Sequence, residues 1–453
     1  EQGREDRSRF FLYLIAATVC LVVSSVVLVT IIFLVFLGPA DPTEAPTASP
    51  SAVPTQAPTK LSFFESMEYL TREAISSPEQ LLNTSSPQYL AVEFVSFDDF
   101  DLAAPFPAGS IRWNQRFALA VFYFSTNGDT WYTCFRGDVN CQGVWIEGDE
   151  CSWKGVTCVD GVVTGLSFAS QRGNGLYGTL PSELSLLRDL KDIALTSEAL
   201  FSTVPESFGE MSNLESLIIS NTPMTGTVPD SLISNRPRMR SILLSNNEFS
   251  GPMPSFRNMG ELATLFFDSN HFTGSILTEL GSLQSLRFLR FFGNELEGTI
   301  PPQIFELTLL QELFVDDNKL NGLLSPQVSR LKDLKRLTMS NNTFTGPIPG
   351  SLGVLSDLER VSLENNKFFG RLPPGLSYLH GLRILSLANN MFTGTIPSGL
   401  AQMTRLNNLT LDRNDFIGAI PKSLCGRLGT TAFSLKELAV DCREVFCTCC
   451  TCS

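Results

Sequence analysis

Histidine is almost absent from this sequence, which contains only His271 and His380 in 453 residues. Histidine is the most frequent general acid or base near neutral pH and a common metal ligand. Both histidines lie in predicted loops or turns, and no motif supplies a serine or cysteine partner for nucleophilic catalysis. We therefore expect no enzymatic activity, no cofactor and no metal site.

Positive charge is also scarce. Charged residues make up 17% of the chain, and 33 lysines and arginines face 46 aspartates and glutamates, for a net charge of −13. A protein that binds nucleic acid or an anionic membrane surface normally presents a basic patch. The composition gives no support to either kind of binding.

A long apolar run is present near the start of the chain. Residues 10–37 contain no charge and no proline, and this run exceeds the roughly 20 residues that cross a bilayer. It predicts one transmembrane helix; the alternative is a signal peptide, whose apolar core is normally about 7 to 15 residues long. Because the chain starts with Glu1 rather than methionine, we expect residues 1–9 to be the end of a longer cytoplasmic segment.

The basic residues near this helix predict its orientation. Three arginines (Arg4, Arg7 and Arg9) precede it, and the next basic residue is Lys60. Positive residues favour the cytoplasmic side, so residues 38–453 are expected outside the cell or in a lumen, with the plasma membrane as the expected location. Residues 38–60 are rich in proline and threonine and predict an extended stalk.

Ten of the eleven cysteines follow the membrane helix, and an even number on an oxidising side favours disulfides. They are Cys134, Cys141, Cys151, Cys158, Cys425, Cys442, Cys447, Cys449, Cys450 and Cys452. Short spacings make Cys134 to Cys141 and Cys151 to Cys158 the simplest of the three pairings open to the first four. For the last six we favour a disulfide-bonded C-terminal cap over a site for zinc or copper(I). N-glycosylation motifs begin at Asn83, Asn341 and Asn408.

Residues 61–161 predict a helical and disulfide-bonded N-terminal cap. Ser86 and Pro87 form a good helix start, because a serine caps the first turn and proline suits its first position. Residues 111–126 form a second, mostly apolar helix.

Residues 162–424 repeat with a period of about 24 residues. The unit reads L-x-x-L-x-L-x-x-N-x-[LF]-x-G-x-[IL]-P and recurs about eleven times. The leucine positions fill a common core, and the asparagine can bond backbone groups between successive turns. The period predicts leucine-rich repeats: an α/β solenoid, a horseshoe with a parallel β-sheet on its concave face. Glu198 and Thr222 replace the asparagine in two early units, so the N-terminal end should be less regular.

The segments "GTIPPQI", "GPIPGSL" and "GTIPSGL" resemble the plant-type class of leucine-rich repeats in receptor kinases, receptor-like proteins and polygalacturonase inhibitors. The segment "CSWKGVTC" resembles the N-terminal cap of that class, which implies a bridge between Cys151 and Cys158. The order of anchor, stalk, cap, repeats and cysteine-rich tail of residues 425–453 is similar to that of diatom leucine-rich-repeat membrane proteins. No kinase motif is present.

The repeat also places side chains on the concave face, because strand residues alternate between the two faces of a sheet. Phe288, Arg290 and Phe292 form the middle row of three neighbouring strands. The predicted grid surrounds Arg290 with phenylalanines and puts carboxylates at three diagonals. The predicted ligand-binding residues are Phe266, Asp268, Phe288, Arg290, Phe292, Glu312, Phe314 and Asp316.

An apolar patch with an embedded arginine is typical of interface hot spots. We therefore expect a receptor-like protein that binds an extracellular protein, peptide or glycan, with a possible co-receptor. The alternatives are a structural or adhesive surface protein without signalling, and an inhibitor of an extracellular enzyme. Within the chain itself, the N-terminal segment 61–110 could instead cover the patch as a lid.

Overall fold

The computed structural model describes residues 60–98, 106–132, 144–170, 173–429, 434–441, 445–446, 449 and 451–452. The chain divides into two units, Glu1–Ala57 and Pro58–Ser453, and only the second contains described residues. The predicted cytoplasmic tail, the membrane helix and the stalk up to residue 59 therefore lie outside the described residues. Among the residues that the structure describes, no helix has both the length and the apolar character needed to span a bilayer.

The N-terminal cap is helical, as predicted. Ser86 begins α4 by accepting a hydrogen bond from the Tyr89 N–H at 3.0 Å, and Pro87 occupies the first turn. Helix α5 is buried on almost all sides because it packs against α4, the strand β2 and the first turn of the repeats. The helices are α2 (Lys60–Arg72), α3 (Pro78–Leu82), α4 (Pro87–Glu93) and α5 (Ile111–Ser125), with a short π-helix at Phe94–Asp98.

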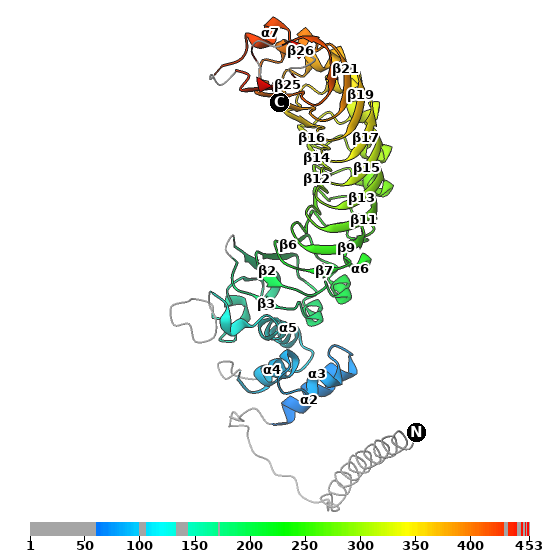
Figure 1. Cartoon of the computed structure of the whole chain (residues 1–453). Helices are drawn as coiled ribbons and strands as arrows, with labels where there is room; N and C mark the ends of the chain where they lie inside the picture. Colours follow the sequence, from blue (N-terminus) through cyan, green and yellow to red (C-terminus); the bar gives the residue numbers. More distant parts are fainter. Residues whose placement is uncertain are drawn as a thin grey trace, which may run out of the picture. The chain divides into compact units, whose positions relative to one another are not determined.

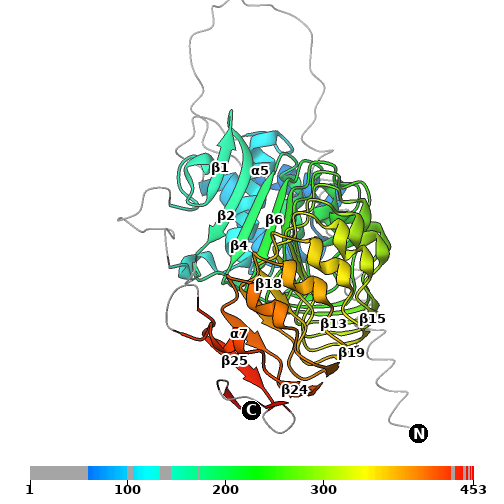
Figure 2. The ribbon, with the colours of Figure 1, turned by 90° about the horizontal axis from the view of Figure 1, so that it is seen from above.

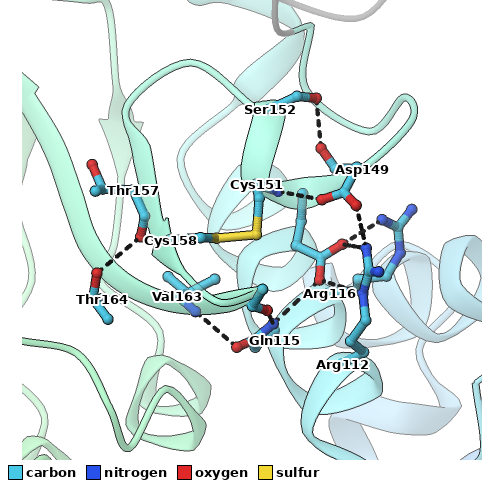
Figure 3. Close-up of a disulfide and its surroundings, with 12 residues drawn as sticks. Arg112, Gln115, Arg116, Asp149, Cys151, Ser152, Thr157, Cys158, Val163 and Thr164 are labelled. Carbon is cyan, nitrogen blue, oxygen red and sulfur yellow. Dashed lines mark hydrogen bonds and ion pairs between the residues drawn. A yellow bond between two sulfur atoms is a disulfide. The ribbon is translucent and has the colours of Figure 1, made fainter.

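An ion-pair cluster joins α5 to the loop before the sheet, and a disulfide joins that loop to β1 (Figure 3). Cys151 and Cys158 are bonded, which confirms the predicted pair. The side chain of Glu150 is fully buried and accepts hydrogen bonds from Arg112 and Arg116, each at 2.9 Å. Burial alone would raise the pKa of Glu150, but the arginines hold this pKa below its ordinary value. Cys134 and Cys141 lie outside the described residues.

Two sheets run along the array, one on each side (Figure 1). The main sheet contains fourteen strands among the described residues, and all its pairs are parallel except β1 with β2. Its strands are β1 (Val156–Val159), β2 (Val162–Ala169), β4 (Asp192–Thr196), β6 (Ser216–Ser220), β8 (Ser241–Leu243), β10 (Thr264–Phe266), β12 (Phe288–Arg290), β14 (Glu312–Phe314), β16 (Arg336–Thr338), β18 (Arg360–Ser362), β20 (Ile384–Ser386), β22 (Asn408–Thr410), β25 (Glu437–Val440) and β27 (Thr451–Cys452).

The second sheet follows the other side of the array and comprises β7 (Thr225–Gly226), β9 (Glu248–Pro252), β11 (His271–Ser275), β13 (Glu295–Thr299), β15 (Lys319–Leu323), β17 (Thr343–Gly346), β19 (Lys367–Gly370), β21 (Met391–Gly394) and β23 (Asp415–Phe416). Short pairs are formed by β3 (Tyr177–Gly178) with β5 (Ala199–Leu200), and by β24 (Gly418–Ala419) with β26 (Val445–Phe446). Most turns carry 3-10 helices, and two carry α6 (Asp230–Ile233) and α7 (Lys422–Cys425). Figure 1 shows the main sheet along the inner side of the curve, and Figure 2 shows β2, β4 and β6 side by side.

The repeated asparagine bonds one coil to the next. Asn294 donates to the carbonyl oxygens of Phe267 and Phe291 at 2.9 and 3.1 Å, and it accepts from the Phe272 N–H at 3.0 Å. Because these backbone groups are buried, they would otherwise lack partners. The same arrangement recurs at Asn270, Asn318, Asn342, Asn366, Asn390 and Asn414.

The irregular early coils use other groups for the same purpose. Glu198 occupies the asparagine slot and accepts from the backbone N–H groups of Asn174 and Leu176 at 2.7 and 3.0 Å. Burial raises the pKa of Glu198, against the lowering effect of these bonds. A carboxylate can therefore replace the asparagine here because it offers enough acceptors for the neighbouring coil.

The C-terminal cap is held by a disulfide between Cys425 and Cys449, whose Cα atoms are 5.6 Å apart. Arg427 donates to the carbonyl oxygens of Met403 and Thr404 at 2.6 and 2.9 Å, which satisfies backbone acceptors of the preceding turn. Within the described residues these contacts favour the predicted disulfide-bonded cap. Cys442, Cys447 and Cys450 lie outside them, and so does the side chain of Cys452.

Candidate ligand-binding site on the concave sheet

The strands β10, β12 and β14 align as the repeat predicts. Phe266, Arg290 and Phe314 are register partners, and so are the buried leucines one residue before them. The alternation sends the leucines into the core, where their exposure is at most 1%, while the three partners stay half-buried on the opposite face. Phe288 and Phe292 flank Arg290 on the same face and are also half-buried. We call Phe266, Phe288, Arg290, Phe292 and Phe314 the aromatic patch.

Arg290 lies between two rings at the centre of the aromatic patch. Its guanidinium carbon is 4.2 Å from the ring centroid of Phe266 and 5.2 Å from that of Phe314. These distances are those of cation–π contacts. The rings that stack on the cation therefore belong to the two neighbouring strands, whereas the grid predicted phenylalanine contacts on four sides.

Glu312, on the neighbouring strand β14, supports this arrangement. Its side chain is nearly buried, and its carboxylate lies 2.7 Å from Arg290 and 3.0 Å from Arg336. Two arginines of the same sheet thus occupy the oxygens that the sequence analysis assigned to a ligand. We infer that Glu312 holds the guanidinium of Arg290 in place between the rings.

The other two predicted carboxylates turn toward their own neighbours. Asp268 is buried and accepts from the Ser245 hydroxyl at 2.8 Å. Asp316 accepts from the Ser340 N–H at 2.8 Å and from the Thr338 hydroxyl. Burial raises the pKa of both carboxyl groups. Of the three predicted carboxylates, only Glu312 forms a described ion pair with Arg290.

A cavity of about 300 Å³ opens on the same face next to the aromatic patch. Phe292 and Phe314 form its apolar wall, and Asp316 belongs to it as well. The rest of the lining is Asp317, which follows β14, and residues of β16, β18 and the stretches just after them: Thr338, Ser340, Asn341, Arg360, Ser362 and Glu364. The sequence analysis did not assign these residues to the site. The sequence did contain a signal for them: the residues at the outward-facing strand positions change from aromatic to polar along successive repeats.

Two predicted glycosylation residues lie on or beside this face. Asn341 is exposed at the cavity and donates to the Asp317 carboxylate at 2.6 Å. Asn408 lies on β22 and donates to Glu437 at 2.7 Å. Asn83 lies far away, after α3, and is exposed. Glycosylation at the three positions stays a prediction.

The N-terminal helices do not form the lid considered from the sequence. In the described parts of residues 61–110, the helices pack on one another and, through α5, on the first turn of the repeats. Figure 1 places α2 to α5 at the N-terminal end of the array, away from β12. This packing contradicts the lid interpretation, because α5 buries the apolar faces of the segment itself.

Other groups of chemically active side chains have structural partners. Asp149, Glu150 and Cys151 lie close enough to resemble a metal site. Cys151 is bonded to Cys158, however, and Arg112 contacts both carboxylates. The two histidines are exposed on separate coils.

The comparisons with known proteins agree with this fold. The family model described as "Leucine Rich Repeat" matches residues 333–355 and 381–403. A solved structure of the ectodomain of the receptor kinase GASSHO1/SCHENGEN3 from Arabidopsis thaliana, in complex with CASPARIAN STRIP INTEGRITY FACTOR 2, is 31% identical, with a TM-score of 0.61 over 66% of this chain and 36% of that one. The chain carries leucine-rich repeats of the plant type.

Two further structures show the range of similar proteins. The plant peptide hormone receptor RGFR1, solved with RGF2, is 27% identical, with a TM-score of 0.54 over 62% of this chain and 48% of the receptor. A plant ice-binding protein is 22% identical, with a TM-score of 0.52 over 75% of this chain and 97% of that protein, and shows the fold alone. The leucine-rich-repeat chain thus spans less than half of each of the two receptor chains. No curated protein sequence gives a significant match.

Proposed function

We propose that this leucine-rich-repeat protein is a membrane-anchored recognition protein that binds a peptide ligand on its concave face, as a receptor with a possible co-receptor. The observation that carries the proposal is the aromatic patch: four half-buried phenylalanines around a fixed arginine, beside a cavity of about 300 Å³. Aromatic residues and arginine dominate binding hot spots, and a rigid arrangement loses little entropy when it binds.

The comparisons support a peptide among the ligands expected from the sequence. RGFR1 was solved with RGF2 as a plant peptide hormone receptor, and the GASSHO1/SCHENGEN3 ectodomain was solved in a complex as well. A regular array of threonines, which ice binding would require, is absent from the described second sheet. The residue before the repeated glycine is Glu297, Asn321 or Phe369 in three of its strands. We propose a binding function and no catalytic one.

The test is selection of binding peptides from a displayed random library on the purified full chain. The selected peptides are then measured against the double variant Phe288→Ala/Phe292→Ala. A matched control is Tyr177→Ala/Phe201→Ala, because these two rings are also in contact, with centroids 5.3 Å apart, and are exposed on another sheet. We expect the first variant to weaken binding by about 30-fold or more, and the control to bind like the parent chain.

A further inference from the structure

The cavity beside the aromatic patch combines an aromatic wall with an excess of carboxylates. Its charged lining residues are Asp316, Asp317, Glu364 and Arg360, which are three carboxylates against one guanidinium. Arg360 is exposed, and its Nε donates to the Ser362 hydroxyl at 3.1 Å. The cavity therefore favours a positively charged group.

One buried acceptor in the cavity is unused among the described residues. The Oε2 atom of Glu364 is buried and has no hydrogen-bond partner. A buried polar atom without a partner costs free energy that a donor group can recover. A ligand that brings an N–H donor would satisfy this atom.

Arg290 on β12 shows that a guanidinium group fits between aromatic rings and a carboxylate on this sheet. Arg290 lies between the rings of Phe266 and Phe314 and bonds the Glu312 carboxylate. The cavity one strand further on offers the same set, because Phe292 and Phe314 supply rings and Glu364 supplies a free carboxylate oxygen. No described side chain of the protein places a cation in contact with the Phe292 ring.

We propose that this cavity receives an arginine or lysine side chain of the peptide ligand, which stacks on Phe292 and donates to Glu364. The proposal rests on the proposed function and adds the chemistry of one ligand position. Burial raises the pKa of Asp316, as expected for a carboxyl group without a counter-cation of its own. The net charge of −13 also favours the approach of basic peptides.

The test uses peptides selected from the displayed random library on the full chain. Each selected peptide is resynthesised in a series in which each arginine in turn is replaced by citrulline and each lysine in turn by norleucine, which remove the charge and keep most of the shape. The affinities are compared for the parent chain, for Glu364→Gln, and for the control Glu297→Gln, an exposed glutamate on the second sheet. Melting temperatures check that each variant folds.

We expect one basic position in the peptides whose neutralisation weakens binding to the parent chain at least tenfold. Glu364→Gln should remove most of this preference, and Glu297→Gln should keep it. Peptides that bind equally well after neutralisation, or an unchanged preference in Glu364→Gln, would overturn the proposed cavity ligand but leave the concave-face site intact. Peptides whose binding survives Phe288→Ala/Phe292→Ala would instead refute the proposed site. Binding of oligosaccharides on a glycan array, with no peptide selected, would overturn the proposed basic peptide. It would leave only the proposal that the protein recognises a ligand.

Discussion

The substitution Glu312→Gln tests whether the buried carboxylate fixes the arginine of the aromatic patch. Glu312 is nearly buried and pairs with Arg290, whose side chain is 30% exposed, and with the more exposed Arg336. Removing one partner from a buried ion pair costs about 3 to 5 kcal/mol, whereas exposed pairs contribute about 0 to 1 kcal/mol. Because both arginines are partly exposed, we expect Glu312→Gln to lower the free energy of unfolding by an amount between the two ranges, about 2 kcal/mol.

The assay is thermal unfolding followed by circular dichroism. For an array of this size, about 2 kcal/mol corresponds to a fall in melting temperature of roughly 3 °C. The matched control is Glu295→Gln on β13, because Glu295 pairs with Lys319 at 2.8 Å and both side chains are largely exposed. The control should leave the melting temperature unchanged. If the two variants melt at the same temperature, Glu312 does not have the supporting role that we infer.

Further predictions concern the stability of the N-terminal cap, the pH dependence of that stability, and the repeated asparagines that bond one coil to the next. Glu150→Gln should destabilise the cap by about 3 kcal/mol at pH 7, because it neutralises a buried carboxylate that pairs with Arg116. The folded pKa of Glu150 is below the ordinary 4.5, so its contribution is fully present above that pH and is lost as the pH falls through the folded value. Melting temperatures of parent and variant should therefore converge in acid, and a constant difference would contradict the ion-pair account. Asn294→Ala should cost about 2 to 3 kcal/mol in chemical denaturation, since it leaves the buried Phe272 N–H without its acceptor. Asn321→Ala, at an exposed asparagine on β15, should change stability by less than about 0.5 kcal/mol, and equal effects of the two substitutions would refute the ladder's role.

The fold of each repeat could be predicted because one rule covers most of the units. The leucines of β10, β12 and β14 and the asparagine ladder follow from the 24-residue period, and so does the register of the concave face. The period could not predict how Glu198 would replace an asparagine, because that depends on which backbone groups face the slot. It also could not select Cys449 as the partner of Cys425, because six cysteines allow many pairings.

The candidate site could be predicted only in part. Alternation placed the phenylalanines beside Arg290, but rotamers decide that Glu312 bonds two arginines while Asp316 turns to Thr338 and Ser340. The cavity beyond them depends on side chains from four coils, so no single repeat unit predicts it. For this reason the sequence identified the aromatic half of the site and missed the polar half.

The most direct test of the central claim is the affinity of selected peptides for three forms of the full chain, measured by isothermal titration calorimetry. Loss of about 30-fold or more in Phe288→Ala/Phe292→Ala, with parent-like binding in Tyr177→Ala/Phe201→Ala, is the predicted result. The four rings are all partly exposed, so both variants should fold. Equal affinities of all three forms would contradict recognition through the concave aromatic patch.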